Sequence, residues 1–284
     1  MWTTRYVTRK PRQVVDEMKH YVQEYQVDNF NFCDLTAIIK KEWIVEFCNI
    51  LKEENLNVTW QLPTGTRSEA LDEEVLPLVY ETGCRNITYA PESGSDRMLK
   101  VIKKKVQLPR MLNSLRTAHR SGLVTRVNII IGHPEEKRSD TWKSLRFLIQ
   151  CAIAGCQDAA VMIFAPYPGS EDTKKLITQG RLKIGSDYYY LALARSGWSS
   201  HTYNPVMGTR ELIIMQFFML FVFYAVAYLT RPWRFIETIR SLFTGKEQTQ
   251  LDQLLRTKFK KERKTSRKLD WVEEPVIAGS MRES

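Results

Sequence analysis

The sequence predicts an α/β fold: a partial, open barrel of the TIM type, made of parallel strands and followed by C-terminal helices. Short apolar runs recur along the 284 residues, and each is followed by a turn and a stretch with helical periodicity. The predicted strands end at Asp34, Leu62, Glu92, Gly132 and Pro166. Successive ends lie roughly 30 to 40 residues apart, the length of a strand–helix unit in a parallel sheet. An open, doubly wound sheet is the alternative.

The predicted strands have the composition of strands that helices cover on the outside. Residues 127–131 read VNIII and residues 160–164 read AVMIF, so both faces are apolar. The earlier strand segments are 27–34, 57–62 and 86–92. Their regular alternation with helices favours a barrel, in which each strand pairs with the next one along the chain.

Amphipathic segments between these strands predict six helices. The segments are residues 11–26, 41–53, 71–83, 108–122, 139–155 and 171–180. Gly83 and Gly122 suit the C-terminal ends of two of them, because glycine tolerates a left-handed backbone. Ser139 is a plausible N-cap for the fifth helix.

The chain changes character after Trp198. Residues 212–229 carry no charge, and this length is at the lower limit for a membrane-spanning helix. Arg210, Glu211 and Arg231 flank the run closely. A transmembrane anchor, a helix on a membrane surface and a packed C-terminal helix are all open interpretations. Pro232 ends this helix, and residues 233–243 predict a second, amphipathic one.

Charge and cysteine usage limit the setting of the protein. The net charge is +10, and much of it lies in residues 100–105 and 256–268. No aromatic platform accompanies these basic blocks, so we expect no nucleic-acid partner but a possible contact with an anionic membrane surface. Five scattered cysteines without a C-x2-C pair predict no metal site and a reduced compartment. We expect a cytoplasmic protein that can associate with a membrane.

Polar residues follow the predicted strand ends. They are Asp34, Arg67, Glu92, Ser93, Asn128, His133 and Glu135. In a parallel α/β barrel, ligands bind at the carboxyl ends of the strands, so this recurrence predicts one shared ligand site. A polar residue at such a position can also cap the next helix, and this is the simpler alternative for each residue alone.

Several segments together resemble radical S-adenosylmethionine (SAM) enzymes of the cobalamin-associated class, which includes the anaerobic magnesium-protoporphyrin ester cyclases. FNFCD resembles the second strand of that barrel, and YAPESG the end of the fourth. VNIIIGHPEE resembles the fifth-strand G-x-I-x-G-x-x-E pattern, read onto Asn128, Ile130, Gly132 and Glu135. APYPGSE resembles the sixth strand, and VFYAVAYLTRPWRF the helix and Arg-Pro junction that follow the barrel.

The resemblance implies SAM as a cofactor and a role for each matching residue. Asp34 would accept hydrogen bonds from the SAM ammonium group, and Arg67 would pair with its carboxylate. Glu92 and Ser93 would hold the polar end of SAM or its ribose, and residues 128–132 would lie along the adenine. Two positions depart from the family pattern: Cys33 stands where the family often has a second acid, and Asn128 replaces a glycine.

A larger departure concerns the iron–sulfur cluster. The family binds a 4Fe–4S cluster through a C-x3-C-x2-C loop after the first strand, and this sequence contains no such triplet. The resemblance therefore implies a C-terminal part of a longer enzyme, lacking the cobalamin domain, the first strand and the cysteine loop. A truncated gene, a wrongly assigned start and a split subunit are the three explanations, and in each the chain alone would not cleave SAM.

The resemblance also divides the chain. Residues 1–200 would form the partial barrel, 201–245 the C-terminal helices and 246–284 a basic, flexible tail. The expected partners are an N-terminal half or subunit carrying the cluster loop, and a small-molecule substrate, for which a large apolar or tetrapyrrole-like molecule is one option. A noncatalytic SAM-binding or scaffold module on a membrane surface is the alternative function. A conventional barrel enzyme that uses Glu92 and His133 as an acid/base pair is a third interpretation.

Overall fold

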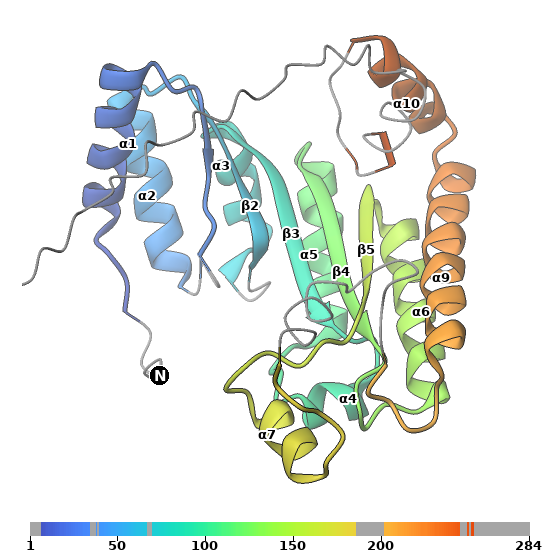
Figure 1. Cartoon of the computed structure of the whole chain (residues 1–284). Coiled ribbons are helices and arrows are strands. Elements are labelled where there is room, and N and C mark those ends of the chain that lie inside the picture. The colour runs from blue at the N-terminus through green and yellow to red at the C-terminus, as the bar shows by residue number, and fades with distance from the viewer. Residues whose placement is uncertain are drawn as a thin grey trace, which may run out of the picture.

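The computed structural model describes residues 7–34, 38, 40–66, 70–185, 202–244, 249 and 251–252. Five strands form one parallel sheet in the order β1-β2-β3-β4-β5 (Figure 1). The strands are β1 (Asn29–Asn31), β2 (Thr59–Thr66), β3 (Cys84–Glu92), β4 (Val124–Ile131) and β5 (Asp158–Ile163). This sequential order confirms the partial, open barrel and removes the doubly wound alternative, which requires a reversal of strand order.

Helices cover one face of the sheet and its β5 edge. They are α1 (Pro11–Tyr25), α2 (Lys41–Glu54), α3 (Val75–Glu81), α4 (Asp96–Val101), α5 (Leu108–Arg120), α6 (Arg138–Ala154), α7 (Glu171–Thr178), α9 (Thr209–Thr230) and α10 (Trp233–Thr244). The helices α3 and α5 lie behind the sheet in Figure 1; α2 packs against α3, and α6 packs against α5 and β4. The helices α4 and α7 lie at the carboxyl ends of the strands, and α10 at the amino ends.

Two helix starts differ from the predicted ones, and in both cases an aspartate explains the difference. The helix expected from residue 71 begins at Val75, because the Asp72 carboxylate accepts the N–H groups of Glu74 and Val75, both at 3.1 Å, and fixes a turn first. Ser139 lies inside α6 and is not its N-cap. The Asp140 carboxylate accepts the N–H of Lys137 at 3.0 Å and caps the helix from within its first turn.

Alternate residues of the strands face opposite sides of the sheet. On β4, Thr125, Val127, Ile129 and Ile131 are all fully buried beneath the helices. Arg126, Asn128 and Ile130 lie on the other side, the inner face, and are partly buried. Parallel pairing extends this inner face across the sheet, because Arg126 stands opposite Thr88 on β3 and Asp158 on β5.

The helix α9 closes the β5 edge of the sheet. It packs against α6 and β5, and the Gln216 side chain donates to the carbonyl of Val161 at 2.6 Å. The Tyr224 hydroxyl donates to Asp158 at 2.5 Å, a contact that raises the tyrosine pKa together with burial, the larger cause. In the described part of the chain, α9 is the one helix that is long and apolar enough to cross a membrane.

The Arg-Pro junction after α9 joins this helix to α6. The Arg231 guanidinium donates to the carbonyls of Ala152 and Ile153, each at 2.8 Å, at the C-terminal end of α6. A cation at this position satisfies carbonyls that have no partner within the helix. The next arginine, Arg234, is buried and donates to the carbonyl of Gln157 at 2.7 Å.

Candidate functional site

Glu92 occupies an unusual backbone conformation at the carboxyl end of β3. Its φ is 69°, in the left-handed region, which a residue with a side chain adopts at a cost. The pairing of β3 with β4 shifts register between Tyr89 and Glu92, and β2 has a similar irregularity between Leu62 and Thr66. Such bulges re-aim side chains at the rims of barrels. The carboxyl edge is therefore specially shaped at two adjacent strands.

The Glu92 carboxylate is accessible and paired with a lysine. Its oxygen lies 3.0 Å from Nζ of Lys104, and the two side chains are 25% and 37% exposed. Lys104 follows α4, so the pair spans the turn after β3. A partly exposed carboxylate beside a flexible lysine can still accept a hydrogen bond from a ligand.

The residues directly after Glu92 fasten β3 to α6. The Ser93 hydroxyl lies 3.3 Å from that of Ser144 and accepts the N–H of Ser95. A Cβ on Gly94 would lie 2.7 Å from the Cα of Ser144, so this position needs glycine for close packing. Ser93 is only 3% exposed, and its hydroxyl is engaged in contacts that hold the turn in place.

Asp140 of α6 completes this connection. Its buried carboxylate accepts bonds from the Ser95 hydroxyl at 2.7 Å and from the Arg97 guanidinium, with Nε–Oδ2 at 3.1 Å. Burial alone would raise its pKa, but the bonds from Arg97, Ser95 and the Lys137 N–H outweigh burial and lower the pKa to about 2. No local sequence pattern indicates this cluster, because Arg97 and Ser95 lie 43 and 45 residues before Asp140 in the chain.

The turn after β4 is organised by Glu136 and not by Glu135. The Glu136 carboxylate is buried and accepts the N–H of Gly132 at 2.5 Å, the N–H of His133 at 3.3 Å and the Thr141 hydroxyl at 3.0 Å. Burial, which outweighs these bonds, raises the Glu136 pKa to about 7. Glu135 is half-exposed and 3.6 Å from Lys175.

Gly132 itself requires glycine for two reasons. Its φ is 83°, and a Cβ there would lie 2.6 Å from Cδ1 of Leu212 at the start of α9. The close neighbour is thus a helix of the protein. Gly132 fixes where α9 crosses the end of β4.

His133 is engaged in loop contacts, and no hydrogen bond joins it to Glu92 in the described structure. His133 Nδ1 accepts the N–H of Glu135 at 3.2 Å, and Nε2 lies 3.3 Å from the Asp172 carboxylate on α7. Glu92 pairs with Lys104 instead. The buried Asn204 side chain donates to the carbonyls of His133 and Glu136 at 2.6 and 2.8 Å, and so ties a distant segment to this loop.

Asn128, Arg126 and Thr66 of the sheet each have an enclosed side-chain atom without a hydrogen-bond partner in the described part of the chain. Asn128 is the one that the sequence singles out. Its Oδ1 is enclosed and has no hydrogen-bond partner within the described part of the chain. Its neighbour on β5 is Ala160, a small residue, and Ile130 stands next on the same face of β4 opposite Met162. An enclosed carbonyl oxygen without a donor is costly, and a ligand with an N–H group would satisfy it.

Other inner-face side chains nearer the amino ends bond to each other. The Asn86 amide donates to Gln61 Oε1 at 3.0 Å, and the Gln61 amide donates to Asn31. Arg126 lies 3.6 Å from Asp158. The inner face is therefore polar across all five strands, which is suited to a ligand and unsuited to packing against an apolar layer.

Asp34 and Arg67 complete the predicted set. Asp34 is exposed and follows β1, and the Thr64 hydroxyl of β2 donates to its backbone carbonyl. Asp34 therefore lies at the carboxyl end of the neighbouring strand pair. Arg67 lies outside the described residues.

All five cysteines are free thiols. Cys48, Cys84, Cys151 and Cys156 are buried and Cys33 is exposed. Burial raises the pKa of the Cys48 and Cys156 thiols to about 11 and 12, away from the thiolate form that binds iron. Among the described residues, no group of three His, Cys, Asp or Glu could hold a metal ion.

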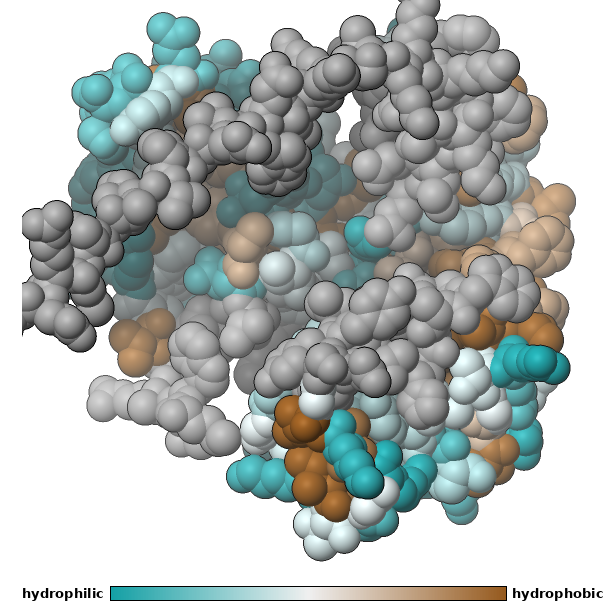
Figure 2. Space-filling model, in the orientation of Figure 1, coloured by the Kyte–Doolittle hydropathy of each residue, from teal (hydrophilic) through white to brown (hydrophobic). Residues whose placement is uncertain are grey.

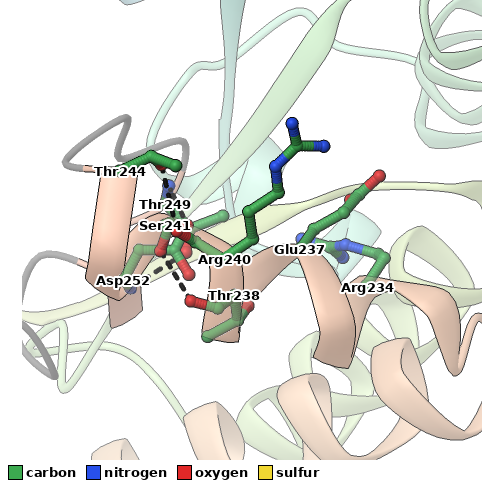
Figure 3. A pocket seen from close by; sticks show the side chains of 8 residues that line it. All are labelled: Arg234, Glu237, Thr238, Arg240, Ser241, Thr244, Thr249 and Asp252. Atoms are coloured by element: carbon green, nitrogen blue, oxygen red, sulfur yellow. Dashed lines mark hydrogen bonds between the residues drawn. The ribbon is translucent and has the colours of Figure 1, made fainter.

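A separate hollow lies at α10, at the amino ends of the strands (Figure 3). Its volume is about 350 Å³, and its lining combines both charges with several hydroxyl groups: Arg234, Glu237, Thr238, Arg240, Ser241, Thr244, Thr249 and Asp252. It lies at the other end of the sheet from Glu92, so it is not part of the predicted site.

Comparison with known proteins places the chain among related enzymes. Residues 2–148 match the Radical SAM superfamily, just over half of the chain. A cytidylyl-2-hydroxyethylphosphonate methyltransferase of Streptomyces wedmorensis is 31% identical over 63% of this chain and 34% of its own length. An anaerobic magnesium-protoporphyrin IX monomethyl ester cyclase of Rubrivivax gelatinosus is 26% identical over 50% of this chain and 26% of its own.

A third relative and one solved structure agree with these. An uncharacterised methyltransferase of Pyrococcus horikoshii is 27% identical over 56% of this chain and 33% of its own. The methyltransferase TsrM of Kitasatospora setae, solved with cobalamin and a [4Fe-4S] cluster, shares the fold with a TM-score of 0.50 and 16% identity, covering 62% of this chain and 35% of its own. The chain thus spans about a third or less of the length of these relatives. It belongs to the radical SAM superfamily.

Proposed function

We propose that the carboxyl edge of the sheet binds S-adenosylmethionine, and that the chain is the C-terminal portion of a radical SAM oxidoreductase or methyltransferase. The observation that carries this proposal is Glu92, an accessible carboxylate on a non-glycine residue held at positive φ. Such a conformation costs about 1–3 kcal/mol, and strained residues of this kind cluster at functional sites. Gln26 and Asn55 also have positive φ but end helices, whereas Glu92 ends a strand.

We assign one residue to each of several polar groups of SAM. The Glu92 carboxylate accepts hydrogen bonds from the ribose hydroxyls or the ammonium group. Asp34, which follows β1, accepts a hydrogen bond from the ammonium group. Asn128 Oδ1 accepts from the amino group of the adenine, which is an N–H donor of the kind this enclosed oxygen lacks. Arg67 pairs with the SAM carboxylate. Ile130 offers an apolar side chain beside the base.

Ser93, Gly132 and Glu135 have different roles in this proposal. Ser93 and Gly132 shape the edge through their contacts with α6 and α9. Glu135 orients Lys175 on the exposed surface of α7. Substitution of any of the three would change the affinity for SAM indirectly, through the shape of the carboxyl edge.

The 4Fe–4S cluster, which would supply the electron for reductive SAM cleavage, is proposed to come from a polypeptide outside this chain. The edge of β1 is the place for it. Each later helix in the barrel connects one strand to the next, and such crossovers are right-handed. If α1 connects a preceding strand to β1 in the same way, that strand lies beside β1. This is the sheet edge that has no partner strand within the described residues. A strand followed by a C-x3-C-x2-C loop would join the sheet there and bring the cluster to the carboxyl edge.

The substrate is proposed to be a small molecule that enters over the inner face, and a large apolar or tetrapyrrole-like molecule is one option. The supporting observations are the similarity to the cyclases and the polar side chains of the inner face. A noncatalytic SAM-binding or scaffold role at a membrane surface is the second candidate, favoured by the exposed apolar surface of α9. In either case residues 1–200 would form the SAM-binding unit, 201–245 its helical extension and 246–284 a basic tail.

Anaerobic titration calorimetry with SAM tests the binding proposal directly. We expect the full chain to bind SAM, and Glu92→Gln to weaken binding about tenfold by removing the charge from the hydrogen bonds. Glu171→Gln is the matched control, because Glu171 is also paired with a lysine but is exposed on α7. Equal SAM affinity of the Glu92 variant and the wild type would refute the assignment.

A second experiment separates catalysis from binding. The purified chain, reconstituted with iron and sulfide and reduced, should form no 5′-deoxyadenosine. Addition of a polypeptide with the first strand and its cysteine loop should restore its formation if the chain is an enzyme portion. Formation of 5′-deoxyadenosine by the chain alone would refute the proposed dependence. SAM binding without any restored cleavage would favour the scaffold role.

A further inference from the structure

The outer side of α9 exposes large apolar side chains along one stripe. Ile214 is 66% exposed, Phe217 50%, Phe218 41%, Phe221 71% and Leu229 82%. Their spacing of three, four and eight residues places them on one face of a helix. Figure 2 shows apolar residues along this side of the molecule, at the right of the view over α9. Soluble surfaces seldom expose so many large apolar groups together.

The stripe continues onto both neighbouring helices. The Trp142 side chain of α6 is 52% exposed and packs edge-on against Phe218, with ring centroids 6.2 Å apart. On α10 the side chains of Trp233, Phe235, Ile236 and Ile239 are 55%, 59%, 68% and 41% exposed. We refer to the exposed apolar side chains of α6, α9 and α10 as the outer apolar surface. Its aromatic residues are of the kind that lies at the level of lipid headgroups.

Basic residues surround this surface. Lys143 and Arg146 are exposed on α6, Arg210 is exposed at the start of α9, and Arg240 on α10. The sequence 256–268, which follows α10 along the chain, holds eight Lys or Arg residues and one Glu. Apolar side chains bordered by cations match the interface of an anionic bilayer, where each basic residue near the surface adds to binding.

The inner side of α9 cannot leave the protein without loss of specific contacts. Gln216 and Tyr224 bond to β5, and Arg231 bonds to the end of α6. A helix that crossed a bilayer would expose these polar groups to hydrocarbon. The same contacts keep the outer apolar surface parallel to the sheet edge, so α9 is suited to lie in the plane of an interface.

We propose that the outer apolar surface docks on an anionic lipid bilayer with α9 in the membrane plane. A second copy of the chain is a poorer occupant, because two copies would bring the same basic border together. The surface borders β5, at the opposite edge of the sheet from β1 (Figure 1). Membrane docking and the proposed addition of a strand at β1 therefore occupy separate surfaces, and the SAM site does not depend on either.

Vesicle flotation with the full chain tests the proposal. We expect binding to vesicles with about 30% phosphatidylserine, at least tenfold weaker binding to pure phosphatidylcholine, and a similar loss between about 0.1 and 0.5 M salt. Ile214→Glu/Phe221→Glu should reduce the partition coefficient about tenfold or more. Val7→Glu/Tyr25→Glu is the matched control, since these side chains are 80% and 68% exposed and lie before α1 and at its end, away from α9 in sequence. In Figure 1, α1 and α9 lie on opposite sides of the molecule. Circular dichroism and SAM titration establish that each variant is folded.

Three outcomes would overturn the proposal. The first is equal partitioning of the Ile214/Phe221 variant and the wild type. The second is resistance of the bound protein to alkaline carbonate extraction, which would indicate a spanning helix. The third is a concentration-dependent dimer in sedimentation that the Ile214/Phe221 variant abolishes, which would make a second copy the occupant. The two proposals fail separately: a wild-type chain that binds SAM but not vesicles would contradict membrane docking and leave the proposed SAM site intact.

Discussion

The helix-covered side of the sheet and its inner side differ in how fully their polar groups are paired. On the covered side, buried Asp140 has Ser95, Arg97 and the Lys137 N–H as partners, and buried Glu136 has three donors. On the inner side, Asn128 has an enclosed oxygen without a partner in the described structure. Glu92, at the carboxyl edge, is accessible on a strained backbone. Stability thus depends on the covered side, and the inner side and carboxyl edge keep capacity for a ligand.

The largest expected effect comes from Asp140, whose removal would test the stability half of this contrast. Asp140→Ala leaves the buried Ser95 hydroxyl without its acceptor and the Arg97 guanidinium without its carboxylate partner, with the Glu135 carbonyl still accepting from Arg97. It should lower the free energy of unfolding by about 3 kcal/mol. Urea unfolding measures it. Glu171→Ala, which removes an exposed ion pair with Lys103, should change stability far less. An Asp140 variant as stable as the wild type would show that the turn after β3 is held by other contacts.

The pH dependence of stability distinguishes the two buried acids. The Asp140 pKa is depressed to about 2, so its contribution is present above pH 4 and is lost as pH falls toward 2. The Glu136 pKa is raised to about 7, so stability falls as pH rises from about 4.5 through 7, by up to about 3 kcal/mol. Glu136→Gln should remove the second dependence and leave the first. A Glu136→Gln protein that still loses stability between pH 5 and 8 as the wild type does would contradict this.

Glu92→Gly should separate stability from ligand binding. Glycine adopts the left-handed backbone without a Cβ penalty, so the free energy of unfolding should stay the same or rise by up to about 1 kcal/mol. SAM affinity should fall with the loss of the carboxylate. Gln26→Gly is the matched control, because Gln26 also has a positive φ, 55°, but lies at the end of α1. It should gain stability with no change in SAM affinity, by calorimetry and thermal unfolding.

Asn128→Ala gives the smallest expected change in stability, and the most direct test of the inner face. Removal of an unpartnered oxygen should leave stability unchanged or slightly higher, while SAM affinity falls about tenfold. Asn86→Ala is the comparison within the same face, because the Asn86 amide already bonds to Gln61. It should lower stability slightly and spare SAM binding. The reverse pattern for the two asparagines would remove Asn128 from the site.

Local signals explain what could be predicted from the sequence. Strand and helix positions followed from periodicity, and Gly83 and Gly122 were recognised as helix ends, where φ is 97° and 91°. The prediction of Glu92 at a strand end is confirmed, because an acid after an apolar run is visible within a few residues. The parallel sheet followed from regular strand spacing, which is also a property of the chain alone.

The remaining site features depend on contacts between distant residues. Asp140 and Ser144 were not singled out, because their partners in the turn after β3 lie 43 to 51 residues earlier. The family pattern predicts Glu135 as the site residue of this turn. The turn geometry decides which of the two adjacent carboxylates is buried, and it buries Glu136 and leaves Glu135 exposed. Asn204 clamps the β4 loop from outside the matched region, and no periodicity indicates such a contact.

The close approach of Gly94 to Ser144 has a consequence for sequence variation. A Cβ at position 94 would lie only 2.7 Å from the Cα of position 144. A larger residue at position 94 would therefore push the two backbone segments apart and disturb the bond between Ser95 and Asp140. Related sequences that carry a larger residue at position 94 should therefore also differ on the facing turn of α6. Positions 94 and 144 are expected to vary jointly among homologues, and a statistical survey would detect that pairing without any purified protein.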